Sequence, residues 1–390
     1  MSASQTFDLI LYVNHIPVEL RKIILKYYHL PVSSKNYDIY RLKKIWCTSA
    51  SYEEIHEICM IYGHISIWDT SSVTSMKNLF MYPTCFNDDI SNWDTSNVTD
   101  MSGMFKNAAS FNQSLEKWNM SSVTNVSSMF ENATSFNQPL EKWNMSSVTN
   151  ASSMFKNATS FNQPLEKWDM RSVTNVSSMF SGAILFNQPL NWKTNSLRYV
   201  KLMFSGAISF NNDVENLNMS LVTDMSGMFQ NAEMFNKPVE SWNIRNVLDV
   251  TSMFQGAKSF NQPLNKWNTS SIKYTSYMFN NATKFDQSLE MCNFASVTDA
   301  STMFSNAVSF NKPIGNWNNS KIMCTFAMFM NAKSFNQALD NFNTSSLKIS
   351  RSMFNGAVSF NQPLEVWNEC NIDDNFLMFY DTNSLKQMNK

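Results

Sequence analysis

The sequence is poor in charged residues and in glycine and proline, and neither charge is in surplus. Only 16% of its 390 residues are charged, 30 of them basic and 31 acidic. This balance excludes a protein that binds nucleic acid through bulk electrostatics. No stretch approaches the roughly 18 consecutive apolar residues of a membrane-spanning helix. With 30 Phe, 12 Tyr and 11 Trp, the chain nevertheless has ample apolar surface to bury, which excludes intrinsic disorder.

Residues that carry chemistry are also scarce. All four histidines precede residue 65, and no phosphate-binding loop or nucleophile-elbow motif occurs. The six cysteines are scattered without a pairing or zinc-binding pattern, which favours free thiols in a reducing compartment. Carboxylates recur once per repeat, as at Glu116, Glu141 and Glu166, in the manner of a solvated surface row. We therefore expect no enzymatic activity, no metal site and no cofactor.

The abundant feature is a single repeat. A phenylalanine, usually preceded by methionine, recurs every 25 residues, with one interval of 24. A unit of this length cannot enclose a core alone, but stacked copies can. From residue 64 onward the sequence therefore predicts thirteen copies of one unit. Their phenylalanines are Phe80, Phe105, Phe130, Phe155, Phe180, Phe204, Phe229, Phe254, Phe279, Phe304, Phe329, Phe354 and Phe379.

The unit at residues 115–139 shows the local structure that the pattern predicts. Between residues 121 and 136 the apolar positions are three and four apart, which predicts a short helix. Leu115, Trp118 and Met120 have the spacing of a short strand, as in a leucine-rich repeat. The predicted fold class is an α/β repeat, a leucine-rich-repeat-like solenoid of about thirteen 25-residue strand-helix units. A small all-α N-terminal module precedes it.

Two polar positions are expected to support the stack. The residue after Trp, such as Asn119, is Asn or Asp in every unit but the one with Lys193. We predict that these side chains hydrogen-bond up and down the stack, with a ligand-binding row as the alternative. The Phe-Asn-Gln-Pro sequence at residues 136–139 predicts a turn in which Asn137 bonds its own backbone.

The run W-N/D-x-S-x-V-T-x-M-S-x-M-F-x-N/G-A-x-S-F-N-Q-P-L, repeated over residues 64–390, resembles BspA-like bacterial surface proteins. It also resembles the mycoplasma surface lipoproteins that share this repeat. The resemblance implies a leucine-rich-repeat-like solenoid used for surface adhesion and protein binding, with no catalytic residues to transfer. The sequence departs from the pattern where Leu217, Cys292 and Phe342 replace Trp.

The first 50 residues have a different pattern. Ile16–Tyr28 has a Pro, a Glu-Leu and an Ile-Leu pair at the spacings of an F-box, and Tyr40–Trp46 occupies the place of its later hydrophobic positions. Residues 1–50 thus resemble an F-box-like helical module, which implies binding to a Skp-type adaptor. An unrelated helical cap is the alternative, because an open solenoid end exposes apolar surface. The expected adaptor-binding residues are Ile16, Pro17, Leu20, Ile24, Leu25 and Tyr27.

Residues 51–63 are predicted to form an N-terminal capping helix, which separates this module from the solenoid at 64–390. Ser51 and Glu54 form a capping box at its start, and Gly63 suits the position after its end.

The start of the sequence bears on localisation. It has no basic region and no lipobox cysteine, so export as a lipoprotein is not expected. Asn-x-Ser/Thr triplets, as at Asn132, Asn144 and Asn281, would invite dense glycosylation in a eukaryotic secretory pathway. We therefore expect an intracellular protein. An F-box-like head on a repeat array, in an Asn- and Lys-rich composition, resembles adaptors of large DNA viruses, which implies the host cytoplasm.

The function that follows is a non-enzymatic adaptor that presents a target protein to a cullin-type ubiquitin ligase. The alternative is a structural or adhesive repeat protein without a ubiquitin link. Target binding is predicted at the variable position before Trp, where Lys117, Lys142 and Lys167 form a short positive ladder that favours an acidic segment. Three solvated lysines without a partner are the alternative.

Overall fold

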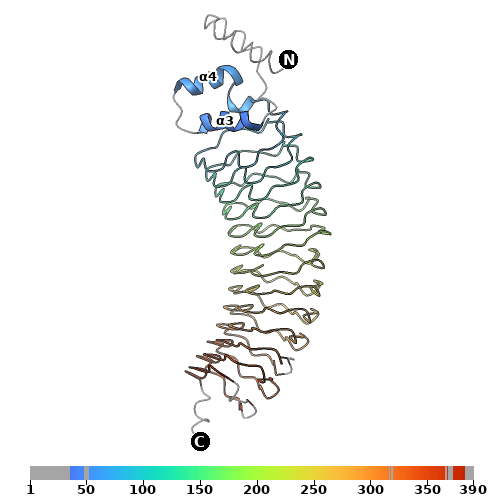
Figure 1. Ribbon diagram of the computed structural model, residues 1–390, viewed down its shortest axis with the longest axis vertical. Coiled ribbons are helices and arrows are strands. Elements are labelled where there is room, and N and C mark those ends of the chain that lie inside the picture. The colour runs from blue at the N-terminus through green and yellow to red at the C-terminus, as the bar shows by residue number, and fades with distance from the viewer. Residues whose placement is uncertain are drawn as a thin grey trace, which may run out of the picture.

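The computed structural model describes residues 36–47, 52–315, 317, 319–364, 367 and 372–382. Stacked coils form an elongated solenoid, and helices α3 (Asn36–Cys47) and α4 (Tyr52–Tyr62) lie at one end of it (Figure 1). A 3-10 turn, η1 (Ile65–Ile67), leads into the first coil. Among the described residues, no helix is both long and apolar enough to cross a membrane. We number the coils 1 to 13 by the phenylalanines listed above, so that coil 1 contains Phe80 and coil 13 Phe379.

The repeat contains consecutive tight turns where a helix was predicted, so the prediction of a helix in each unit is wrong. Ser128 and Asn132 have φ values of 56° and 60°, in the left-handed region that an α-helix cannot contain. The N–H groups of Met129 and Ala133 donate to the carbonyl three residues back, whereas that of Phe130 donates to the next coil. Each turn brings the chain back to the core after three or four residues. The spacing of apolar residues therefore imitates that of a helix.

Single parallel bridges connect the coils where a strand per unit was predicted. They do not involve Trp118 or Met120 but join equivalent residues such as Asn125 and Asn150 in successive coils. We call the positions equivalent to Asn125 the bridge row. Among the described residues the structure has no continuous strand, so the fold is a repeat solenoid built from turns and bridges.

The core positions were predicted correctly. Phe130 and Phe136 are fully buried and stack with ring centroids 4.0 Å apart. Phe130 also stacks on Phe155 of the next coil at 5.5 Å, so the aromatic column is continuous between coils. Trp118 is buried too, and its indole N–H donates to the carbonyl of Ile90 in the preceding coil. These contacts join each coil to its neighbours rather than closing a core within it.

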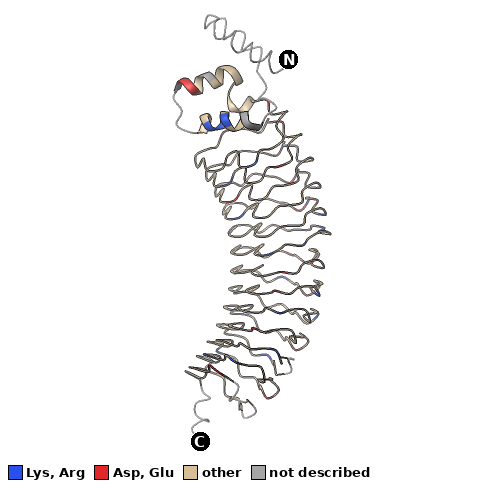
Figure 2. Cartoon of the chain, viewed as in Figure 1, with Lys and Arg blue, Asp and Glu red and all other residues tan. Residues whose placement is uncertain are grey.

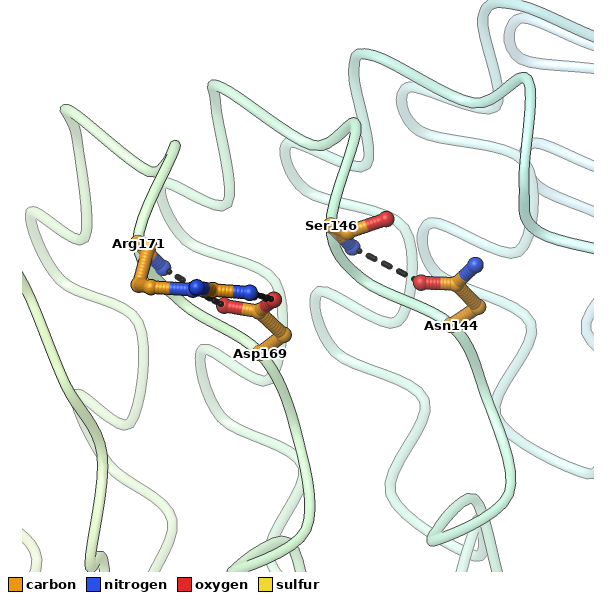
Figure 3. A network of polar contacts seen from close by, with 4 residues as sticks. All are labelled: Asn144, Ser146, Asp169 and Arg171. Atoms are coloured by element: carbon orange, nitrogen blue, oxygen red, sulfur yellow. Dashed lines mark hydrogen bonds and ion pairs between the residues drawn. The ribbon is translucent and has the colours of Figure 1, made fainter.

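The polar rows differ from the prediction. The oxygen of Asn144, in the position after Trp, accepts the N–H of Ser146 two residues later in the same coil (Figure 3). In coil 5, Asp169 does the same and also binds the Arg171 guanidinium. The expected bonding of this row up and down the stack is therefore wrong. A side chain at this corner reaches the second following N–H, the geometry of an Asx turn, before it reaches another coil.

Asparagines at two other positions connect the coils. Asn112 accepts hydrogen bonds from Asn137 N and Gln138 Nε2 of the next coil, at 2.9 and 3.0 Å. Asn137 Oδ1 likewise accepts from Asn162 N and Gln163 Nε2 of the following coil, so it does not bond its own backbone as predicted. At the left-handed position that Asn132 occupies in coil 3, the equivalent Asn157 of the next coil donates its Nδ2 to Asn132 Oδ1 at 2.8 Å. These two ladders hold the register of the stack.

Helix α3 packs directly on coil 1. Ile39 and Leu42 are buried in the same apolar cluster as the coils. The Tyr40 hydroxyl donates to the carbonyl of Lys77, and Trp46 Nε1 donates to Asp88 at 3.0 Å. Trp46 also meets Trp68 edge to face. The side chains that resemble the later F-box positions therefore contact the first coil and cover the end of the core.

Helix α4 lies where the capping helix was predicted. Its C-terminal end is closed by Gly63, whose φ is 76° and whose N–H donates to the Cys59 carbonyl at 3.0 Å. This is the left-handed glycine that commonly terminates a helix.

Candidate protein-binding face

One side of each coil carries four positions around the bridge row that are partly or fully exposed in coil 3 and include buried residues in some other coils. In coil 3 they are Thr124, Asn125, Ser127 and Ser128, which alternate with buried apolar residues of the same segment. We call the surface formed by these four positions in all coils the bridge face. Because the backbone beneath it is held by bonds between coils, its side chains are presented at a regular interval of about 4.8 Å.

In coils 2 to 5 the bridge face carries only small side chains, namely Thr, Asp, Asn, Ser and Gly. Their polar groups are largely used within the solenoid. Thr124 Oγ1 donates to the Thr99 carbonyl at 3.2 Å, and Asn125 Oδ1 accepts the N–H of Ser127 at 3.0 Å. This part of the face offers a partner little apolar area and few free donors.

In coils 6, 8, 9 and 11 to 13 the same positions include large side chains, whereas coils 7 and 10 keep small ones. The large side chains are 38% to 58% exposed, so packing inside the solenoid does not require them. Aromatic residues, methionine and arginine are enriched in protein interfaces, and such residues dominate here. The exposed apolar members are Tyr199, Leu248, Tyr274, Tyr277, Met323, Phe326, Ile349, Phe376 and Leu377.

Apart from Tyr199 on coil 6, these side chains form two clusters. We call Leu248, Tyr274 and Tyr277, in coils 8 and 9, the tyrosine cluster. The other cluster covers coils 11 to 13, and we call it the C-terminal patch. It consists of Met323, Phe326, Ile349, Phe376 and Leu377. Coil 10 separates the two with small polar residues.

Charges of both signs are distributed along the solenoid, without one large field of either sign (Figure 2). On the bridge face, Lys201 lies 3.9 Å from Asp224 in the next coil. Elsewhere Glu131, largely buried, bonds Lys106 at 2.7 Å and lies 3.4 Å from Lys156. Burial alone would raise the pKa of Glu131, but hydrogen bonds from Lys106 and Ser128 and the two ammonium charges outweigh it and lower that pKa.

The lysine ladder predicted for target binding is exposed but paired. Lys142 Nζ lies 3.1 Å from Glu116, and Lys167 Nζ lies 3.0 Å from Glu141, in each case across one coil boundary. The side chains alternate in charge instead of forming a purely positive row. Lys117 is also exposed. Target binding by these lysines stays a prediction.

The predicted adaptor-binding residues lie outside the described part of the chain. They are Ile16, Pro17, Leu20, Ile24, Leu25 and Tyr27.

The large residues of the bridge face were missed by the sequence analysis, although the sequence contained a signal. In coils 6, 8, 9 and 11 to 13 the segment that reads Val-Thr-Asn-Val-Ser-Ser-Met in coil 3 acquires large residues, for example at Tyr199 and Phe326. The core positions of Val123 and Met129 stay apolar while their neighbours change. Since this segment was assigned to a helix, the departures were not recognised as one surface.

The described residues offer no group of three or more His, Cys, Asp or Glu side chains that could hold a metal ion. Burial raises the pKa of the Cys292 thiol to about 12, although a hydrogen bond with Thr269 opposes the shift. Burial likewise raises the pKa of Cys47 to about 11. Thiols with such pKa values are protonated at neutral pH and are poor nucleophiles.

The comparison with protein families agrees with the repeat architecture. The family model described as "Mycoplasma protein of unknown function, DUF285" matches four times, at residues 50–167, 153–256, 209–317 and 308–390. No curated protein sequence is similar to the chain. Among solved structures, the one titled "Crystal structure of TLR13-ssRNA13 complex" is 11% identical with a TM-score of 0.28. That match covers 92% of this chain and 57% of the other.

Proposed function

Since the chain belongs to this DUF285 repeat family, we propose that it is a non-enzymatic protein-binding scaffold whose bridge face captures a partner. The observation that carries the proposal is the change along this face. Coils 2 to 5 present small polar side chains, whereas coils 6, 8, 9 and 11 to 13 present large exposed ones on the same backbone. A structural role alone requires the core positions to repeat, and it gives no reason for exposed tyrosines on the bridge face.

The tyrosine cluster is the part of this face proposed to bind the target. Tyr274 and Tyr277 are 49% and 41% exposed and lie three residues apart on one coil, with Leu248 on the coil before. Tyrosine combines a large apolar ring with a hydroxyl, so it contributes contact area and hydrogen bonds at a low cost in conformational entropy.

In its full form the proposal is an F-box-like adaptor that presents the target to a cullin-type ubiquitin ligase through a Skp-type protein. The support is the sequence of Ile16–Tyr28, and the adaptor-binding residues would be those named above. The same reading places the protein inside a cell, in the host cytoplasm if it is viral. The alternative is a structural or adhesive surface protein in which the N-terminal residues act as a cap. The packing of α3 on coil 1 favours this alternative.

One pull-down from a eukaryotic lysate with the full chain tests both binding sites. Leu20→Asp with Ile24→Asp should abolish recovery of Skp and cullin subunits while the target is still captured. Tyr274→Ser with Tyr277→Ser should do the reverse. Tyr82→Ser serves as the matched control, because Tyr82 is 64% exposed but lies off the bridge face. If the unaltered chain binds no Skp protein, the adaptor proposal fails and the structural or adhesive protein is the remaining function. A target retained by the tyrosine variant would refute the proposed face.

A further inference from the structure

The C-terminal patch gathers five exposed apolar side chains on three successive coils. Phe326, Arg351 and Phe376 occupy equivalent positions in coils 11, 12 and 13, and the Arg351 guanidinium lies 4.9 Å from the centre of the Phe376 ring. Met323 on coil 11 and Ile349 on coil 12 occupy two other positions of the bridge face, and they are 51% and 39% exposed. Side chains of this size, each exposing on the order of half its surface, add up to an apolar patch typical of protein contact sites.

The charges within the patch form a basic row along coil 12 and an acidic row along coil 13. Coil 12 contributes Lys348 and Arg351, and coil 13 contributes Asp373 and Asp374. The pairs between these rows are long: 4.0 Å from Lys348 to Asp373 and 3.9 Å from Arg351 to Asp374. The carboxylates are 73% and 41% exposed. They retain lone pairs that a second set of cations could use.

We propose that the C-terminal patch binds the same patch of a second copy of this chain. In an antiparallel pair related by a two-fold axis between coils 12 and 13, the basic row of one copy faces the acidic row of the other. Lys348 then faces Asp373 of the partner subunit, and the apolar side chains of coils 12 and 13 are covered. A parallel pair would place like charges together, which is unfavourable. The contact is isologous, because one patch supplies both complementary rows.

The size of the patch sets the strength of this association. Two or three coils bury less than the roughly 800 Å² per partner of a standard stable interface, so the dimer is a weak one. It leaves the tyrosine cluster uncovered, because coil 10 separates the two. A dimer therefore carries two target-binding surfaces that point away from the shared end. The inference concerns the purified chain alone and does not depend on any target.

Sedimentation equilibrium of the full chain, from a few micromolar to several hundred micromolar, measures the dimer directly. Asp373→Lys with Asp374→Lys should weaken dimerisation at least tenfold. Adding Lys348→Asp and Arg351→Asp to the same chain should restore it, since the swapped rows are again complementary. Ile349→Ser removes apolar contact without changing charge and should also weaken the dimer. Melting curves of all variants confirm that each is folded.

The matched control is a pair with the same geometry elsewhere on the bridge face. Lys201 and Asp224 occupy the positions equivalent to Arg351 and Asp374 and lie the same 3.9 Å apart. Reversing Asp224 to Lys should leave the dimer unchanged. The proposal is overturned if the unaltered chain stays monomeric, if the control weakens the dimer equally, or if the fourfold swap does not restore it. A monomeric chain that needs Ile349 to capture a target would instead assign the patch to target binding.

Discussion

Trp143 donates its indole N–H to the carbonyl of Leu115, 28 residues earlier, at 2.9 Å. The same bond recurs from coil to coil, for instance from Trp168 to Leu140. It joins a buried side chain of one coil to the backbone of the previous one, so it acts across the interface on which a solenoid depends. At coil 12 the donor is missing, because Phe342 replaces Trp.

We expect Trp143→Phe to reduce the free energy of unfolding by about 1 kcal/mol for the hydrogen bond, plus a smaller amount for lost packing. The loss is modest because the Leu115 carbonyl also accepts the N–H of Trp118. The reverse substitution, Phe342→Trp, supplies a donor for the Ile314 carbonyl and should stabilise the chain. Urea denaturation of both variants measures the two effects. Opposite signs are required, and two losses of equal size would contradict this role of the indole.

The phenylalanine column should be far less tolerant. Phe180 is fully buried between Phe155 and Phe204, each 5.7 Å away, and stacks on Phe186 at 4.0 Å. Truncation to alanine leaves a cavity in a stack that cannot close around it, at a cost of about 3–5 kcal/mol. Exposed Lys193→Ala is the control and should change stability by less than about 0.5 kcal/mol. A loss below about 1 kcal/mol for Phe180→Ala in denaturant melts would remove this residue from the core.

The core residues could be predicted from the sequence, whereas the path of the backbone could not. Both outcomes follow from the fact that the spacing of buried residues is fixed by stacking and not by one backbone conformation. Buried positions such as Phe130 and Val123 repeat because stacking requires them, whatever path the backbone takes between them. A helix and a run of three-residue turns return to the core at similar intervals, so periodicity does not separate them. The discriminating signal was the recurrence of Asn or Gly at the position of Asn132, since both residues tolerate the left-handed conformation.

The candidate site was missed because it shares that segment. A helix over residues 121–136 would have spread its polar positions around a cylinder, whereas the turns place them side by side on the bridge face. Residues such as Tyr274 therefore could not be grouped before the backbone was known. The packing of Trp46 against coil 1 likewise depends on where α3 meets the solenoid, and a motif within α3 does not contain that information.

Gly182 occupies in coil 5 the left-handed position equivalent to Asn132, and substitutions there test what this position requires. Its φ is 71°, and a Cβ built on it would lie 2.1 Å from Asn157 Oδ1. Asn at this position is expected to cost little, because it tolerates the conformation and can extend the amide ladder after a small movement of Asn157. Val should cost at least about 2 kcal/mol, since a β-branched residue is strained there and cannot join the ladder. Thermal melts of the two variants should differ clearly, and equal losses would rule out the ladder as the compensating factor.

The pH dependence of stability should contain a contribution from Glu131. Its pKa in the folded chain lies below the ordinary 4.5, chiefly because hydrogen bonds and the charges of Lys106 and Lys156 outweigh burial. A depressed carboxyl pKa stabilises the folded state above pH 4.5, and this stabilisation is lost as the pH falls through the folded value. Glu131→Gln should therefore lower stability at pH 7 and flatten the acid limb of the curve. Glu166→Gln, at an exposed position, is the control. Parallel curves for wild type and Glu131→Gln would contradict this account.

Charge reversal in the lysine ladder distinguishes a role in target binding from a row of solvated lysines. Reversing Lys117, Lys142 and Lys167 to Glu breaks two exposed ion pairs with glutamates, which should each contribute less than about 1 kcal/mol, so the fold should survive. If the ladder binds an acidic segment, the triple change should weaken target capture at least tenfold, and more at low salt, because steering charges are screened. Lys266→Glu is the matched control. It breaks a 3.3 Å pair with Glu240 in the same arrangement, several coils away from the ladder. Unchanged capture by the triple variant, with the tyrosine variant still defective, would assign the target to the bridge face alone and leave the three lysines as solvated residues.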